Sequence, residues 1–164
     1  MAKKTLNLLE KLREKYPYPT YAFISEFRGG TGWERESRAD ALAMNTWPSE
    51  GLELIGFELK TSRRDWLKEL KNQDKCEPIK QFCDRWYVVY DEQRIVRDWE
   101  DKIPEDWGLM YLEFDKFVIK KEAPRLNPKP IDRAFLASLM RIASNPFEEV
   151  LINGRKYTTI NPKE

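Results

Sequence analysis

Two carboxylates and a lysine are the residues of this sequence best placed to do chemistry: Asp40, and Glu58 followed two positions later by Lys60. Carboxylate oxygens are typical ligands of Mg²⁺, which proteins often hold through one or two acids together with water and substrate phosphate. The 164 residues include no histidine, which excludes Ser-His-Asp and Cys-His nucleophile systems, imidazole zinc sites and a histidine general base. Proton transfer then falls to carboxylates, lysine, tyrosine, cysteine or a metal-bound water.

These residues belong to two apolar runs, 39–46 and 52–60, whose short connection contains proline and glycine and predicts a β-hairpin. A hairpin symmetric about Ser49 sets Asp40 opposite Glu58. Side chains so opposed have Cβ atoms ~4.5–5.5 Å apart, and like charges there are destabilising. The two acids should therefore repel or one of their pKa values should rise, unless a cation lies between them, either the lysine on the same face or a divalent metal. The alternative is an ordinary solvated charge pair.

The elements around this hairpin follow from apolar periodicity and turn signals. Helices are predicted at 5–16, 62–70, 77–83 and 135–143, and strands at 86–90, 108–113 and 116–121, with a last hairpin turning at 153–154. A Ser-x-x-Asp capping box opens the helix at 62. Residues 21–28 suit a short helix or a strand, and the proline before them and the glycines after them favour the helix. On the early hairpin, alanines at 39, 41 and 43 share the face away from the acids, so we expect both faces to be buried.

Composition indicates one folded domain with a strongly solvated surface. Hydrophobic residues make up 41% of the chain and include 6 Trp and 8 Phe, which is enough for a core, while charged residues reach 35%. Cys76 and Cys83 are expected to be free buried thiols. No apolar run reaches the ~18–20 residues of a membrane span, and no signal-peptide pattern is present. We therefore expect no membrane association and an intracellular, cytoplasmic protein.

Asp40 followed by Glu58-Leu59-Lys60 resembles the D…(D/E)-x-K core of the PD-(D/E)XK nuclease superfamily, which is restriction-endonuclease-like in fold. The surrounding sequence resembles a narrower group, the MmcB-like DNA repair proteins and related phage nucleases. The resembling stretches are 25–28, 38–41, 47–49, 57–66 and 107–109, and together the resemblance covers about residues 6–124. Residue 39 is alanine where the superfamily name has proline, a position that often varies.

The resemblance implies an α/β (α+β) fold with an αβββαβ core, in which helices flank a mixed central sheet. Residues 1–164 would form a single nuclease-like domain, with a C-terminal helix and hairpin extension from about residue 125. Asp40 and Glu58 would bind Mg²⁺ or Mn²⁺, with the backbone carbonyl of Leu59 as a third ligand and Glu26 as an extra carboxylate. Lys60 would orient the attacking water and stabilise charge at the phosphate. Whether one metal or two act is left open.

The implied function is a metal-dependent deoxyribonuclease in DNA repair or phage DNA processing, an endonuclease or else an exonuclease. DNA is the expected partner, and the net charge of +1 does not oppose this, because it averages over faces of different charge. Arg63 and Arg64 at the helix start, together with Arg38 and Lys75, are expected to bind phosphates. The oligomeric state is open, and a homodimer is one expectation.

Two alternatives remain at this stage. The first is a DNA-binding or assembly module of the same fold with little or no nuclease activity, because fold alone does not secure function. The second is an acid–base enzyme that uses the carboxylate pair on a small molecule, which would need a deep pocket rather than an open cleft.

Overall fold

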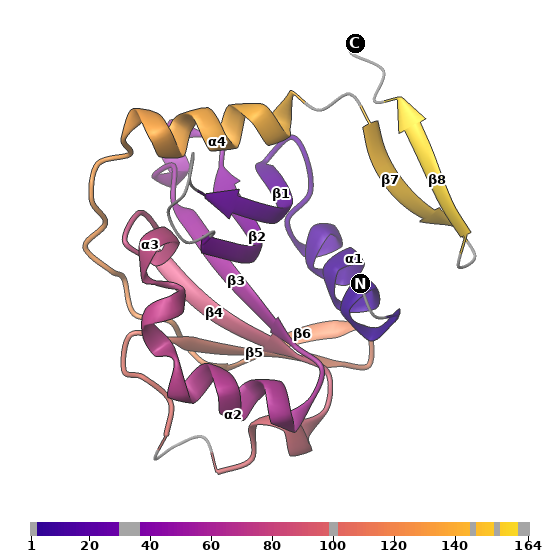
Figure 1. Cartoon of the computed structure of the whole chain (residues 1–164), viewed down its shortest axis with the longest axis vertical. Helices are drawn as coiled ribbons and strands as arrows, with labels where there is room; N and C mark the ends of the chain where they lie inside the picture. The colour runs from indigo at the N-terminus through magenta and orange to yellow at the C-terminus, as the bar shows by residue number, and fades with distance from the viewer. Residues whose placement is uncertain (1–2, 30–36, 99–101, 145–146, 153–154, 161–164) are drawn as a thin grey trace.

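A six-stranded mixed sheet forms the centre of the molecule (Figure 1). The computed structural model describes residues 3–29, 37–98, 102–144, 147–152 and 155–160, and side chains through residue 144. The strands are β1 (Tyr21–Gly29), β2 (Ser37–Asn45), β3 (Leu54–Lys60), β4 (Arg85–Tyr90), β5 (Gly108–Glu113) and β6 (Lys116–Lys121), and they follow one another across the sheet in chain order.

Strand direction decides which strand termini meet at the end of the sheet that carries the acids. β3, β4 and β5 run parallel, whereas β1, β2 and β3 alternate in direction and β6 is antiparallel to β5. The carboxyl ends of β3 and β4 therefore lie beside the end of β1 and the start of β2. This is the end of the sheet that carries Asp40, Glu58 and Lys60.

Helices cover both faces of the sheet, and the helices on each face pack with it into a separate core cluster. α1 (Lys3–Lys15) packs Leu8 and Leu12 against one face. On the other face, Trp66 of α2 (Arg63–Lys71), Ile79 of α3 (Glu77–Lys80) and Phe135 of α4 (Arg133–Ala143) share a second cluster. α4 also lies against β1 (Figure 1). The predicted α+β class and its αβββαβ core are thus confirmed.

Short connections complete the fold. Three 3₁₀ turns, η1 (Pro48–Glu50), η2 (Gln73–Lys75) and η3 (Gln93–Val96), lie between the main elements. The C-terminal β7 (Phe147–Ile152) and β8 (Arg155–Ile160) pair as a separate antiparallel hairpin, as predicted, and its turn at 153–154 falls outside the described residues. Within the described residues, no helix is both long enough and apolar enough to cross a membrane.

Most predicted elements are found where expected. The Ser62 hydroxyl accepts a hydrogen bond from the Asp65 backbone N–H at 3.2 Å, so the capping box does open α2. The predicted helix at 77–83 is shorter, because the backbone N–H groups of Phe82 and Cys83 bond three residues back and close the chain into a tight turn. Cys83 and its companion Cys76 are buried and unbridged, as expected.

The preference for a helix at 21–28 is wrong, because these residues form β1. Their pairing with β2 extends from Tyr21 opposite Asn45 to Gly29 opposite Ser37. Tyr21 and Phe23 also pack against the α1 face of the core. Local proline and glycine signals are weak beside a long cross-strand pairing that buries apolar side chains.

Candidate functional site

The two predicted carboxylates meet where β3 ends. The hairpin register is symmetric about Ser49, with Leu42 opposite Gly56 and Ala41 opposite Phe57, so the predicted register is confirmed. One step further along β2, Asp40 Oδ2 accepts a hydrogen bond from the Leu59 backbone N–H at 2.7 Å.

The two acids lie largely withdrawn from solvent, which disfavours their charged forms. Asp40 is half-buried and Glu58 is only 9% exposed. Every residue of β3 is buried, so Glu58 does not belong to a solvated strand surface. The reading of these residues as an exposed charge pair does not hold.

Lys60 is the cation beside these acids, and it is shared with a third carboxylate. Its Nζ donates to Glu58 Oε1 at 2.7 Å and to Oε2 of Glu69, a residue of α2, also at 2.7 Å. Lys60 and Glu69 are each 5% exposed. The lysine therefore bridges the sheet and the helix that covers it.

The shifts in pKa show how strongly the acids interact. Burial raises the pKa of Glu58 to about 7, and the adjacent Asp40 adds to the rise while Lys60 opposes it. Burial also raises the pKa of Asp40, against the Leu59 N–H bond and the charge of Lys60. Burial works against the charge of Lys60, but its two carboxylate partners outweigh this and raise the lysine pKa. Three carboxylates thus share one ammonium, an excess of negative charge that a divalent cation would offset.

The donors near β3 fit a hard cation. Within the part of the chain that the structure describes, no three acidic, histidine or cysteine side chains form a ready ligand cluster. Asp40 and Glu58 supply two carboxylates, and the Leu59 carbonyl between Glu58 and Lys60 is the backbone oxygen expected as a third donor. Mg²⁺ commonly accepts one or two carboxylates and fills its remaining positions with water and phosphate oxygens. An all-oxygen set of this size is therefore suited to Mg²⁺ or Mn²⁺.

Glu26 on β1 occupies the position across from Asp40 on β2. The pairs Ser25–Ala41 and Phe27–Ala39 flank this position on both sides. Glu26 itself has φ of 53°, the left-handed region, which costs a residue other than glycine of order 1–3 kcal/mol. Such strain is found mainly where the surrounding structure needs it, as at binding sites.

Near Glu26 and Asp40, the regular alternation of side chains between the two faces of the sheet is broken on both β1 and β2. Residues three apart on a regular strand point to opposite faces, yet Ile24 and Phe27 of β1 share one core cluster, as do Ala39 and Leu42 of β2. The expectation that Ala39 shares a face with the alanines at 41 and 43 is therefore wrong, since those two belong to the α1 side. The reversal leaves the Glu26 side chain exposed beside Asp40.

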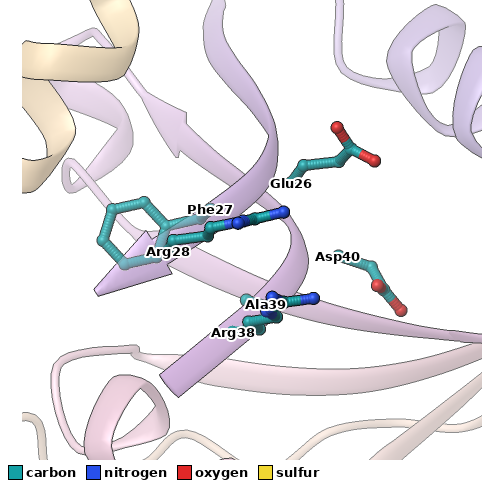
Figure 2. Close-up of a pocket in the computed structure, with 6 residues that line it drawn as sticks. All are labelled: Glu26, Phe27, Arg28, Arg38, Ala39 and Asp40. Carbon is teal, nitrogen blue, oxygen red and sulfur yellow. The ribbon is translucent and has the colours of Figure 1, made fainter. Parts of the chain in front are cut away.

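A small hollow of about 70 Å³ opens at the reversal, lined by Glu26, Phe27, Arg28, Arg38, Ala39 and Asp40. Figure 2 shows the carboxylates of Glu26 and Asp40 and the guanidinium groups of Arg28 and Arg38 extending to the same side. The two arginines are directly opposed across β1 and β2. Like charges so opposed repel, and a phosphate held by both would offset that repulsion.

The residues expected to bind DNA are placed in different ways. Arg38 lines the hollow, and Lys75 is exposed on η2 near enough to Asp40 to oppose the rise in its pKa. Arg64 is exposed at the start of α2. Arg63 instead donates from Nη1 to the backbone carbonyls of Ile95 and Arg97, at 3.1 and 2.8 Å, and so ties η3 to α2.

Two residues of the site were missed by the sequence analysis. Glu69 lies three residues after Trp66, which puts both on the inward side of α2. An acidic residue on the apolar side of a predicted helix was the signal that could have revealed it. Arg28 could not be paired with Arg38 while residues 21–28 were expected to be helical.

Comparison with known proteins gives a fold and no function. The sequence matches no protein-family model and no curated protein. Among solved structures, it is similar to SPO1766, a protein of unknown function from Silicibacter pomeroyi, with a TM-score of 0.60 and 19% identity. The match covers 87% of this chain and 86% of that chain. At this identity the likeness shows a shared fold alone.

The raised pKa of Glu58 predicts a specific dependence of stability on pH. A buried acid whose pKa rises from its ordinary value to about 7 binds more protons in the folded state than in the unfolded state between about pH 4.5 and 7. Its contribution to the free energy of unfolding therefore falls as pH rises through this window. In urea unfolding without divalent metal, we expect Glu58→Gln to gain stability relative to wild type by up to a few kcal/mol at pH 8 and much less at pH 5.

Glu50→Gln is the matched control, because Glu50 is exposed at the opposite end of β3. It should leave the wild-type pH dependence unchanged. Equal stability differences at pH 5 and pH 8 for Glu58→Gln would contradict the electrostatic account of the site.

Proposed function

We propose that this protein is a divalent-metal-dependent deoxyribonuclease of the PD-(D/E)XK type, which hydrolyses DNA phosphodiester bonds in DNA repair or phage DNA processing. The observation that carries the proposal is the meeting of the half-buried Asp40 with the buried Glu58 and Lys60 where β3 ends. Burying more acids than one lysine neutralises is unfavourable, and a bound divalent cation would offset the excess charge. The residue pattern that resembles the superfamily comprises the same three side chains.

Asp40, Glu58 and the Leu59 carbonyl would hold Mg²⁺ or Mn²⁺, and Glu26, across from Asp40 on β1, would add a carboxylate once its side chain turned toward them. Such a metal lowers the pKa of its bound water and offsets the charge of the phosphate. The chain's own residues supply the rest. The Leu59 N–H orients the Asp40 carboxylate, and the Lys60 ammonium is placed to orient the attacking water and to stabilise charge developing at the phosphate.

The surroundings of the carboxylates favour a polyanionic substrate. Arg28 and Arg38 line the hollow beside Asp40, and Lys75 lies near the same acid. Arginine binds phosphate oxygens through two N–H groups at once. The hollow of about 70 Å³ is far smaller than the ~300–1,000 Å³ of small-molecule pockets, which favours an extended DNA strand over an acid–base reaction on a small molecule.

A DNA-binding module without nuclease activity is the second candidate, and one observation favours it. Lys60 already satisfies one Glu58 oxygen, so part of the site is neutralised without a metal. The two candidates differ in whether DNA is cut when a divalent cation is supplied.

The direct test is a cleavage panel of single-stranded, duplex, flapped and branched DNA with Mg²⁺ or Mn²⁺. We expect at least one substrate to be cut by the wild type, and each of Asp40→Asn, Glu58→Gln and Lys60→Met to lower the rate by at least about 100-fold. Lys116→Met, at an exposed lysine that begins β6, should cut like wild type. Salt-sensitive binding of DNA without cleavage under either metal would support the binding module instead.

Substitution of Arg28 tests the proposed contact with phosphate. With Ca²⁺ in place of the catalytic metal, we expect Arg28→Ala to weaken DNA binding and to reduce the slope of log affinity against log salt by about 1. The control is Arg125→Ala, because Arg125 is exposed and lies 3.7 Å from Asp84, the residue that precedes β4 at the other end of the sheet. If the two variants bind DNA equally well, Arg28 does not contact the substrate.

A further inference from the structure

Glu69 has an unusual position for a helical glutamate. It lies on the inward side of α2 and is only 5% exposed, and its Oε2 is 2.7 Å from Lys60 Nζ. The preceding turn of the same helix buries Trp66 completely. Glu69 therefore occupies a place in the interior where an apolar side chain would be expected.

Stability does not explain this choice. Glu58 already provides Lys60 with a buried counter-charge at 2.7 Å. A second carboxylate adds its own desolvation penalty, and replacing buried ionic groups by apolar ones of similar size is often neutral or stabilising. The charge that Glu69 adds to the cluster therefore calls for another explanation.

The charges of the cluster point to a divalent ion. Asp40, Glu58 and Glu69 carry three negative charges when ionised, and Lys60 carries one positive charge, which leaves an excess of two. Without Glu69 the excess would be one. Lys60 holds Glu58 through Oε1, so a metal that bound Glu58 through this oxygen would compete with the lysine for it.

We infer that Glu69 is a positioning residue, which retains the Lys60 ammonium when Glu58 turns to a divalent cation and so keeps the lysine beside the reacting phosphate. This inference rests on the proposed function and deepens it. Glu69 acts through Lys60 and does not itself bind the metal.

The test is a double-mutant cycle read out as Mn²⁺ affinity of the full chain, measured by electron paramagnetic resonance without DNA. We expect Glu69→Gln to weaken Mn²⁺ binding by about 10-fold, as for other residues that support metal ligands, because Lys60 then stays on Glu58. In a Lys60→Met background the same substitution should have a several-fold smaller effect, and that difference is the coupling. At saturating metal, Glu69→Gln should also lower the rate of DNA cleavage.

Glu77→Gln is the matched control, since it removes one negative charge and one lysine contact from an exposed position. It should leave Mn²⁺ affinity unchanged. Glu69→Leu provides a second variant, which places an apolar side chain of similar size at this buried position, and it should weaken Mn²⁺ binding as Glu69→Gln does.

Wild-type Mn²⁺ affinity in both Glu69 variants would overturn the inference and leave the proposed function standing, as would equal effects of Glu69→Gln with and without Lys60. Failure of the wild type itself to bind Mn²⁺ would overturn the proposed function and the inference with it.

Discussion

The Lys60 ammonium, 2.7 Å from both Glu58 and Glu69, joins the central sheet to α2 at the end of β3. Because β3 is buried along its whole length, the lysine and its two partners are withdrawn from solvent. In such a place each charge interacts strongly with its neighbours. Together with the packing of Trp66, this group ties α2 to the sheet, and it also bonds Glu58 and offsets part of the charge around Asp40.

The β1–β2 side of the site complements this cluster. The positive φ of Glu26 and the reversal of faces on both strands set Glu26 beside Asp40, with two opposed arginines next to them. Strain, buried acids and like-charge neighbours each weaken a fold when taken alone. Their concentration at one end of one sheet is what a site for a cation and a phosphate would produce.

The sequence predicted the parts of this arrangement that depend on local rules. The symmetric connection around Ser49 gave the β2–β3 register, and the capping box gave the start of α2. What it could not give depended on contacts between distant segments. β1 became a strand only because β2 offered a partner, and Glu69 reached Lys60 only because α2 folds back over β3. A strained residue such as Glu26 has no sequence signature, since glutamate rarely takes a positive φ.

A crystal structure of the protein soaked in Mn²⁺, with the ion located by its anomalous scattering, tests the central claim most directly. The account predicts a peak bonded to oxygens of Asp40 and Glu58, at about 2.0–2.2 Å as is usual for a small divalent cation, with Lys60 remaining on Glu69. A structure without a peak at these carboxylates, in which Lys60 still bonds Glu58, would contradict it.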